Sequence, residues 1–227
     1  MKRISVVIPT LNERDSILPL LRRLRPLRAE VIVVDDSSPD GTGLLVQEYA
    51  RRARGVRLLS REGRTGLSSA VLEGFDLARG SILVCMDGDL SHPPELIPAL
   101  VAQIRNGAEV AVGSRRVAGG GTDQWPLHRK LTSDAATLLA RTLLRTRLKD
   151  PLSGFFAVDA AFYRGVRPRL DPRGYKILLE LVVRGRPQRA EEVPFTFRNR
   201  QAGHSKLSPL VAAQYLQMVW GLRRGVR

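Results

Sequence analysis

Two aspartates separated by one glycine, Asp87-Gly88-Asp89, have the residue types and the spacing best suited to chemistry in this 227-residue chain. Two hard oxygen ligands flank a residue without a side chain, so a diphosphate can approach the backbone closely. Mg²⁺ and Mn²⁺ favour such sites, with one or two protein carboxylates, water and substrate phosphate oxygens. A metal bound there could neutralise a diphosphate as it leaves. The motif is common by chance, but here it directly follows the apolar run Ile82–Met86.

Two further polar clusters also follow short apolar runs. Pro9–Glu13 comes at the end of the run that begins at Ile4. Asp35–Gly41 follows the run Val31–Val34. A single carboxylate at a strand end can simply cap the next helix. Three polar clusters at one edge of a parallel sheet instead predict a ligand site, because ligands bind beyond the carboxyl ends of such strands.

The elements that must position these clusters alternate between strand-like and helix-like segments over the first 113 residues. The strand-like runs are short, rich in Val and Ile and continuously apolar, which is typical of strands covered on both faces. Strands are predicted at Ile4–Pro9, Val31–Val34, Val56–Leu59, Ile82–Met86 and Val110–Gly113. Amphipathic helices are predicted at Asp15–Leu24, Leu44–Ala53, Leu67–Ala78 and Leu96–Ile104. This alternation predicts an α/β fold with a mostly parallel, Rossmann-like sheet flanked by helices.

Prolines and glycines modify this scheme. Pro19 interrupts the first helical pattern, so that helix is expected to start late or to kink. Pro93-Pro94 is well placed at a helix start. After Gly113 a glycine-rich loop, Val117–Pro126, breaks the alternation. Beyond it, helices are predicted at Arg129–Leu144 and Ile177–Val183, a strand at Ala190–Phe197, and an apolar tail from Pro209 to Arg224 that either packs on the core or lies on a membrane surface.

Length and cysteine content favour one domain without disulfides. A chain of 227 residues with 43% hydrophobic residues can bury a substantial core. Its one cysteine, Cys85, lies in an apolar run and is expected to be a buried bystander, in a protein from a reducing compartment. The apolar stretch at the N-terminus is too short for a signal peptide, and no window reaches the roughly 20 apolar residues that span a bilayer.

Positive charge is concentrated in the second half of the chain. Lys and Arg number 37 against 22 Asp and Glu, a net charge of +15. Residues 1–110 carry 15 basic and 14 acidic side chains, whereas residues 111–227 carry 22 and 8. Such a field attracts nucleic acid, acidic lipid headgroups or phosphorylated substrates. A solvated Arg-rich surface would explain part of the excess but not its asymmetry.

Nine stretches in chain order carry a family resemblance over nearly the whole sequence. They are VVIPTLNE (6–13), VVDDSSPDGT (33–42), GLSSAVLEGF (66–75), MDGDLSHPPE (86–95), VGSR (112–115), GGGTDQWPLHRKLTS (119–133), DPLSGFF (150–156), YKILLE (175–180) and RNRQAGHSKL (198–207). The sequence resembles family 2 glycosyltransferases of the GT-A fold, and specifically dolichol-phosphate (polyprenol-phosphate) mannose synthases. The long glycine–tryptophan block and the closing G-x-S-K are more specific than the paired aspartates.

The resemblance implies a donor site for a nucleotide sugar and a divalent metal, Mg²⁺ or Mn²⁺. The nucleobase and ribose would be lined by Pro9, Leu11, Glu13, Val33, Asp35 and Asp36. The diphosphate would lie at Asp87, Gly88 and Asp89, with both aspartates binding the metal. The donor phosphates would be covered by Lys176, Arg200, Ser205 and Lys206. Ser91 stands where some members have Gln, so no third metal contact is expected there, and Gly88 in place of the commoner Ala is expected to be harmless.

The resemblance also implies an acceptor site for a lipid-linked phosphate. Arg115, Arg129 and Ser133 would hold that phosphate, and Asp89, Arg115 and Arg129 would act in catalysis. The loop Gly119-Gly120-Gly121 with Trp125 would cover the site. GDP-mannose is favoured over UDP-glucose as the donor, and dolichyl or polyprenyl phosphate is the expected acceptor.

The residues themselves support a phosphate acceptor. Many related transferases that act on sugar hydroxyls need a carboxylate base and carry a Q-x-x-R-W motif, which is absent from this sequence. A phosphate monoester is already largely an anion at neutral pH, because its second pKa is about 6. It needs cationic positioning, which Arg supplies through paired hydrogen bonds. The excess of Arg after residue 111 lies where this requirement would put it.

The expected organisation is a catalytic domain over residues 1–208 and an amphipathic, basic tail over 209–227. Residues 1–113 would bind the nucleotide sugar and 114–208 the acceptor. The resemblance implies that the protein lies peripherally on the cytosolic face of a membrane, where the lipid phosphate of this family is, or that it uses a membrane-spanning partner. Trp220 and Tyr215 are equally compatible with a membrane contact and with core packing.

Two other function classes fit parts of the sequence less well. A sugar-phosphate nucleotidylyltransferase would carry a Gly- and Arg-rich signature directly after the first strand, where this chain has Pro9–Glu13. A nucleic-acid-binding protein would fit the sequence pI near 11.2, but only 5% of residues are aromatic and no known nucleic-acid-binding pattern occurs. Neither class is favoured.

Overall fold

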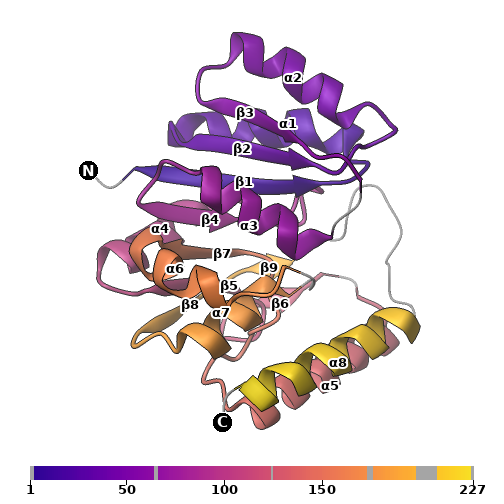
Figure 1. The fold of residues 1–227 in the computed structure, drawn as a ribbon, viewed down its shortest axis with the longest axis vertical. Coiled ribbons are helices and arrows are strands. Elements are labelled where there is room, and N and C mark those ends of the chain that lie inside the picture. Colours follow the sequence, from indigo (N-terminus) through magenta and orange to yellow (C-terminus); the bar gives the residue numbers. More distant parts are fainter. Residues whose placement is uncertain (1–2, 64–65, 124, 173–175, 198–208, 226–227) are drawn as a thin grey trace.

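A seven-stranded sheet forms the centre of the described part of the chain, in the order β3-β2-β1-β4-β7-β5-β8 (Figure 1). The structure is a computed structural model, and it describes residues 3–63, 66–123, 125–172, 176–197 and 209–225. All neighbouring strands are parallel except around β7, which runs antiparallel to both β4 and β5. The mostly parallel, Rossmann-like sheet flanked by helices is therefore confirmed.

The strands keep the first two polar clusters at one edge. Thr10 at the end of β1 pairs with Asp35 at the end of β2. β4 ends earlier, since its last residue, Cys85, pairs with Val7, so the loop with the third cluster begins three residues before the end of β1. The sheet strands are β1 (Ile4–Thr10), β2 (Glu30–Asp35), β3 (Val56–Ser60), β4 (Ile82–Cys85), β5 (Val110–Ser114), β7 (Phe156–Asp159) and β8 (Ala190–Pro194). A separate two-stranded ribbon joins β6 (Gly121–Thr122) to β9 (Thr196–Phe197).

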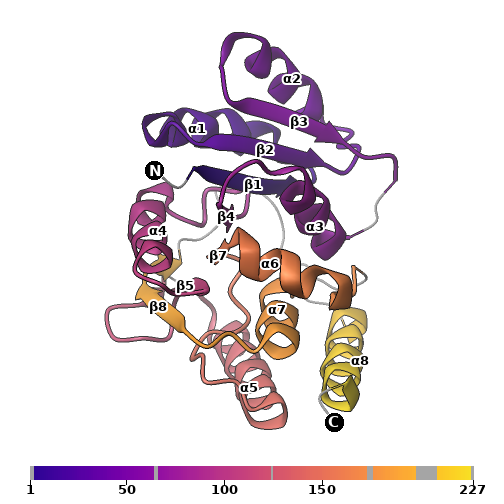
Figure 2. The ribbon, with the colours of Figure 1, turned by 60° about the vertical axis from the view of Figure 1, so that its left-hand side comes forward.

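Helices cover both faces of the sheet (Figure 2). The α-helices are α1 (Arg14–Leu24), α2 (Thr42–Arg52), α3 (Leu67–Leu77), α4 (Ile97–Arg105), α5 (Leu127–Leu144), α6 (Ala160–Val166), α7 (Ile177–Gly185) and α8 (Pro209–Gly225). Short 3₁₀ helices are η1 (Arg25–Leu27), η2 (Pro94–Leu96) and η3 (Arg167–Arg169). In β1, Val6 and Ile8 face the core shared with α1 and α4, whereas Val7 faces the core shared with α3, α6 and α7. The alternation of side chains along a strand thus supplies both cores.

A third apolar core joins α5, α7 and α8. Tyr215 of α8 is buried, and its hydroxyl donates to the carbonyl of Ala136 in α5 at 2.6 Å. Trp220, five residues further along α8 and therefore on a different side of the helix, is 54% exposed. The tail helix therefore packs on the protein through one side and presents another to the outside. No helix among the described residues is both long and apolar enough to cross a bilayer.

Most predicted elements are confirmed to within two residues, with informative exceptions. The late start expected for the first helix is wrong, since α1 begins at Arg14 with Pro19 inside it. Pro19 removes a hydrogen bond to the carbonyl of Asp15, and both residues are exposed, so water can satisfy that carbonyl. The strand predicted over Ala190–Phe197 is divided at Phe195 into β8 and β9. β7 and α6 were not predicted.

Candidate active site

The loops that follow β1 and β2 are tied to each other by hydrogen bonds. The amide of Glu13 donates to the hydroxyl of Thr42 at 2.9 Å, and the amide of Arg14 donates to Asp40 at 3.0 Å. Asp40 also accepts from the amide and the hydroxyl of Thr42. Although burial opposes ionisation, these hydrogen bonds and the charge of Arg14 lower the pKa of Asp40. The first two polar clusters of the sequence, Pro9–Glu13 and Asp35–Gly41, are therefore held against each other by hydrogen bonds.

Asp35 organises the loop that follows it. Its carboxylate accepts from the hydroxyl of Thr10 at 2.9 Å, from the hydroxyl of Ser38 at 2.6 Å and from the amide of Ser38 at 3.0 Å. The residue is buried. A Cβ added at Gly43 would lie 3.0 Å from a carboxylate oxygen of Asp35, so only glycine fits there without movement. Asp35 thus fixes the shape of the loop after β2.

Asp36 is held by a buried arginine. Nε and Nη2 of Arg61 both donate to one oxygen of Asp36. The other N–H groups of Arg61 donate to Ser69 at 2.8 Å, Glu73 at 2.9 Å and the carbonyl of Gly66 at 3.1 Å. All five guanidinium hydrogens are therefore used, which is what a buried guanidinium requires. Arg61 joins the loop after β2 to the start of α3.

The loop after β4 lies against the first strand. A Cβ added at Gly88 would lie 3.2 Å from the methyl group of Thr10 and 3.4 Å from Cγ of Glu13. Alanine there is tight but needs only small shifts. Asp87 is partly exposed, and a Cβ at Gly154 would lie 3.4 Å from one of its oxygens. Asp89 is buried and accepts from the amide of Ser91 at 3.0 Å.

The loop after β4 fits a divalent cation that takes few protein ligands. Among the described residues, no group of three or more His, Cys, Asp or Glu side chains is arranged to hold a metal. Two carboxylates with phosphate oxygens and water are the set that Mg²⁺ accepts. The hydroxyl of Ser91 is buried next to Asp89 and has no hydrogen-bond partner in the described part of the chain. A polar atom left in this state is compatible with a ligand bound close by.

Arg115, at the end of β5, is fixed by a fully buried carboxylate. Nε and Nη2 of Arg115 donate to the two oxygens of Asp150, each at 2.7 Å, and the Arg115 amide donates at 3.0 Å. Burial opposes ionisation of Asp150, but the hydrogen bonds and charge of Arg115, with the charge of Arg116, lower its pKa. This pairing leaves Nη1 of Arg115 to point elsewhere.

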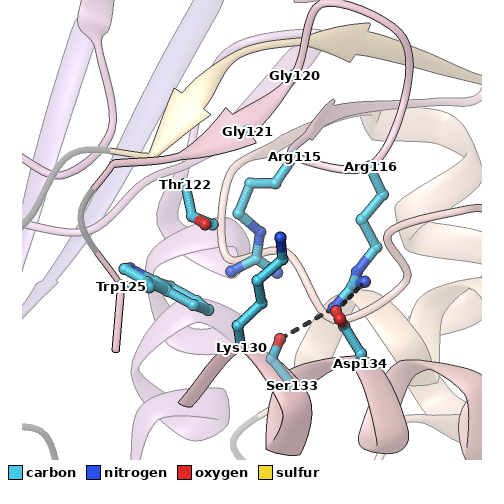
Figure 3. A pocket seen from close by; sticks show the side chains of 9 residues that line it. All are labelled: Arg115, Arg116, Gly120, Gly121, Thr122, Trp125, Lys130, Ser133 and Asp134. Atoms are coloured by element: carbon cyan, nitrogen blue, oxygen red, sulfur yellow. Dashed lines mark hydrogen bonds and ion pairs between the residues drawn. The ribbon is translucent and has the colours of Figure 1, made fainter. Parts of the chain in front are cut away.

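Arg115 opens onto a cationic cavity of about 310 Å³. Figure 3 shows the side chains of Arg115, Lys130 and Ser133 around this space. Arg116 donates to Asp134 at 2.6 Å and to the hydroxyl of Ser133 at 3.0 Å. The lining residues are Arg115, Arg116, Gly120, Gly121, Thr122, Trp125, Lys130, Ser133 and Asp134. Three cations and one carboxylate leave the cavity positively charged, which suits a phosphate.

An aromatic cluster lies between this cavity and the loop after β4. The guanidinium carbon of Arg129 lies 4.1 Å from the centre of the Trp125 ring, and that of Arg115 lies 5.6 Å from it. Trp125 in turn makes an edge contact with Phe197, at 5.4 Å between ring centres. Phe197 also contacts His92. Trp125 therefore packs under the loop and against the two arginines.

The structure brings together part of the predicted acceptor site. Arg115, Ser133, Gly120, Gly121 and Trp125 line the cavity. Arg129 is not among the lining residues. Its guanidinium lies over the ring of Trp125, which does line the cavity. Gly119 adopts a positive φ of 83°, and a Cβ at Gly120 would lie 2.5 Å from the carbonyl oxygen of Ser114. Glycine is thus required at position 120 because the backbone of Ser114 approaches it closely, and it is favoured at position 119 by the positive φ.

Several predicted donor residues are buried, partly exposed or outside the described residues. Pro9 and Val33 are buried inside strands, and the side chain of Val33 belongs to the core, so only its backbone can reach a ligand. Leu11 is partly exposed. Nζ of Lys176 lies 3.4 Å from the carbonyl of Leu152. Arg200, Ser205 and Lys206 lie outside the described residues.

Sequence reasoning missed several residues of this region. Arg116 and Lys130 line the cavity beside predicted residues. Each directly follows a predicted residue, Arg115 or Arg129, and this adjacency in the sequence could have indicated them. Asp150 and Arg61 hold predicted residues in place but come from distant parts of the chain, so spacing could not reveal them. Cys85 is buried and burial raises the pKa of its thiol, which agrees with the expected bystander role.

The chain is similar over most of its length to known transferases. The family described as "Glycosyl transferase family 2" matches residues 5–166. Dolichol-phosphate mannosyltransferase of Pyrococcus furiosus is 43% identical, over 98% of this chain and 64% of that protein. Dolichol-phosphate mannosyltransferase of Saccharomyces cerevisiae is 41% identical, over 95% of this chain and 85% of that protein. The chain thus spans less than two thirds of the length of the Pyrococcus furiosus relative.

Solved structures share the fold. Glucosyl-3-phosphoglycerate synthase from Mycobacterium tuberculosis, crystallised with Mn²⁺, uridine diphosphate and glucosyl-3-phosphoglycerate, superposes with a TM-score of 0.69. The match covers 100% of this chain and 81% of that chain at 25% identity. That transferase therefore has the same arrangement of sheet and helices, and it was crystallised with a divalent metal and a nucleoside diphosphate.

Proposed function

Because this chain belongs to glycosyl transferase family 2, we propose that it transfers mannose from GDP-mannose to a dolichyl or polyprenyl phosphate. An oxygen of the acceptor phosphate attacks the anomeric carbon of the sugar. The bond from that carbon to the diphosphate breaks, and GDP leaves with its electron pair. Attack from the side opposite the leaving group inverts the configuration and gives a β-linked lipid-phosphate mannose.

The observation that carries this proposal is a cationic cavity joined to a carboxylate loop by one packed cluster. The cavity holds Arg115, Lys130 and Ser133, and the loop holds Asp87 and Asp89. The first set suits an acceptor phosphate, and the second suits a donor diphosphate. An enzyme that aligns two bound substrates gains much of its rate from that alignment.

On the donor side, the chain's residues bind and orient the nucleotide. The loops after β1 and β2 form the base and ribose region, shaped by Asp35 and by the Arg61–Asp36 pair. Asp87 and Asp89 would hold Mg²⁺ or Mn²⁺, which when bound supplies charge neutralisation to the departing diphosphate. Lys176, Arg200, Ser205 and Lys206 belong to the same proposal as residues that cover the phosphates.

On the acceptor side, positioning replaces base catalysis. A phosphate monoester is largely dianionic at neutral pH, so no residue has to remove a proton from it. Asp150 occupies two donors of Arg115 and thereby fixes its guanidinium, leaving Nη1 for the phosphate. Lys130, Arg116 and Arg129 add positive charge around the cavity and the ring of Trp125. Asp89, Arg115 and Arg129 remain the proposed catalytic groups.

We also propose that the protein works at a membrane surface, which its lipid substrate requires. Exposed apolar side chains gather on the two packed helices α5 and α8, which lie at the end of the molecule away from α2 (Figures 1 and 2). They are Leu127, Leu131, Leu138, Leu216 and Trp220. Arg223 and Arg224 lie 6.0 Å and 5.5 Å from the Trp220 ring. Apolar side chains beside basic ones suit an anionic interface.

The test is transfer of radiolabelled mannose from GDP-mannose into an organic phase that contains polyprenyl phosphate. We expect label in the organic phase only with a divalent metal present, and a strongly reduced rate of transfer in Asp87→Asn. UDP-glucose serves as the competing donor, since a transferase of the same fold was crystallised with uridine diphosphate. Absence of metal-dependent transfer from either donor would contradict the proposal. Release of pyrophosphate from a nucleoside triphosphate would instead indicate a nucleotidylyltransferase.

A further inference from the structure

His92 is a buried residue that is hydrogen-bonded through Nδ1 to Asp87, in the loop after β4. It is 2% exposed. The amide of Asp87 donates to Nδ1 of His92 at 3.0 Å. Nδ1 therefore carries no proton, and in the neutral ring the proton lies on Nε2. Nε2 lies 3.8 Å from an oxygen of the Asp87 side chain, which is longer than a hydrogen bond but close enough for an electrostatic contact with that carboxylate.

Three phenylalanines hold the His92 ring in one orientation. Phe155 stacks on it with ring centres 5.0 Å apart and an angle of 16° between the planes. Phe195 and Phe197 contact it at 5.7 Å and 5.6 Å, at angles of 69° and 80°. Aromatic pairs with these geometries are favourable beyond their buried area. The ring therefore has little freedom to turn its nitrogens away from Asp87.

The same aromatic cluster reaches the acceptor cavity. Phe197 makes an edge contact with Trp125, and the guanidinium carbon of Arg115 lies 5.8 Å from the centre of the Phe197 ring. On the other side, a Cβ at Gly154 would lie 3.4 Å from both Asp87 and His92. A continuous set of packed groups thus connects the donor carboxylate with the acceptor arginine.

We propose that His92 is a positioning residue that holds Asp87 in the orientation in which its carboxylate reaches the metal and the donor diphosphate. This inference rests on the proposed function. A histidine buried only for packing would need a hydrogen-bond partner, but that partner need not be the backbone amide of a proposed metal-binding residue, with the second ring nitrogen 3.8 Å from the carboxylate of the same residue. Groups that orient metal ligands commonly contribute 10- to 100-fold to metal affinity.

The test measures binding rather than turnover. Mn²⁺ affinity is determined by calorimetry in the presence of saturating GDP, and GDP affinity is determined without metal. His92→Phe keeps an aromatic ring in the cluster and removes both nitrogens. We expect about 10- to 100-fold weaker Mn²⁺ binding in this variant, with GDP binding in the absence of metal retained. His92→Asn offers an amide oxygen to the Asp87 amide, so we expect a smaller loss.

Phe195→Leu is the matched control. It changes a side chain that contacts His92 but leaves the imidazole of His92, with both of its nitrogens, in place. It should lower the melting temperature and leave Mn²⁺ affinity near the wild-type value. Wild-type Mn²⁺ affinity in His92→Phe, or an equal loss in Phe195→Leu, would overturn the proposal. If His92→Phe fails to bind GDP without metal, the His92→Asn variant provides the test. Unchanged Mn²⁺ affinity in His92→Asn would then overturn the positioning role of His92.

Failure of the proposed function gives a different result. If the wild-type protein binds no GDP, or if Asp87→Asn leaves Mn²⁺ affinity unchanged, the donor site itself is wrong. If Asp87→Asn abolishes Mn²⁺ binding and His92→Phe does not weaken it, only the positioning role of His92 is wrong.

Discussion

At the scale of single residues, the site depends on two arginine–carboxylate pairs that differ in exposure from ordinary surface pairs. Asp150 is fully buried beneath Arg115, and Arg61 is buried beside Asp36. Removing one member of a buried pair leaves the other charged and without its partner, which costs far more than breaking a surface pair. These pairs therefore offer sharp tests of how the site is held.

Asp150→Asn should destabilise the protein by roughly 3 kcal/mol at neutral pH, because Arg115 loses its anionic partner. Asp150 has a lowered pKa in the folded protein, so its stabilisation is complete above the unfolded value of about 4. The wild type loses this contribution as pH falls through the folded pKa. The difference between wild type and variant should therefore shrink in acid, as measured by urea unfolding across pH.

The control for this prediction is Asp134→Asn. Asp134 pairs with Arg116, but its side chain is 45% exposed. We expect a loss of at most about 1 kcal/mol, as for other exposed pairs. Equal losses in the two variants would show that burial of Asp150 is not what makes its pair important.

Arg61→Lys should weaken GDP binding and lower stability although the charge is kept. Lysine has three donors on one atom and cannot reproduce the five hydrogen bonds that Arg61 makes. Calorimetric titration with GDP, in the absence of metal, would measure the effect. Arg57→Lys is a suitable control, since Arg57 forms a partly exposed pair with Glu30 away from the loop after β2. GDP affinity that is unchanged in Arg61→Lys would refute the role given to Arg61.

At the scale of elements, the glycine-rich loop before α5 sets the position of Arg115. Gly120→Ala would bring a Cβ to 2.5 Å from the carbonyl oxygen of Ser114 and 3.0 Å from the carbonyl carbon of Arg115. The backbone must shift, and such overpacking costs about 1–3 kcal/mol. We expect a raised KM for the lipid phosphate with little change in the KM for the donor.

Gly121→Ala provides the comparison for the loop. A Cβ there would find its nearest neighbour at 4.0 Å, so the substitution needs no movement. Acceptor kinetics close to wild type are expected. If Gly121→Ala impairs acceptor use as much as Gly120→Ala, the loop acts through its general flexibility and not through the close approach at Gly120.

The elements also show what sequence could predict. The apolar runs of β1, β2 and β4 place their polar ends at one edge, so the position of these polar clusters followed from periodicity and spacing. β7 did not, because it is only four residues long, Phe156–Asp159, and pairs antiparallel with β4 and β5. Its preceding residue, Phe155, brings His92 and the acceptor side together. Contacts between residues 92, 155 and 197 depend on tertiary packing, which one sequence does not encode in any local pattern.

At the scale of the whole molecule, the charged and apolar surfaces face a membrane in our proposal. Trp220→Ala should reduce binding to vesicles of anionic lipid by roughly tenfold, equivalent to about 1.4 kcal/mol, because the exposed ring no longer enters the interface. Flotation of protein with vesicles would measure it. Binding should also weaken with added salt, since Arg223 and Arg224 act through screened charges.

The comparison for membrane binding is Leu77→Ala. Leu77 is 43% exposed but ends α3, a helix that lies beside β1 and apart from the α5–α8 pair (Figure 1). Its loss should leave vesicle binding unchanged. Equal reduction in both variants, or binding unaffected by Trp220→Ala, would mean that another surface contacts the lipid.

The central claim is that two phosphates are bound by separate residue sets, the donor diphosphate at Asp87 and Asp89 and the acceptor phosphate in the Arg115 cavity. The most direct test is an initial-rate matrix in which both substrates are varied, for the wild type, Asp87→Asn and Lys130→Met. Lys130 lines the cavity and is exposed, so its replacement should leave the fold intact.

Lys130→Met is predicted to raise the KM for polyprenyl phosphate several-fold while the KM for GDP-mannose stays at the wild-type value. Asp87→Asn is predicted to impair donor use and metal activation while apparent acceptor affinity is retained. A donor KM that rises in Lys130→Met as much as the acceptor KM, or an acceptor KM that does not change in that variant, would contradict the account.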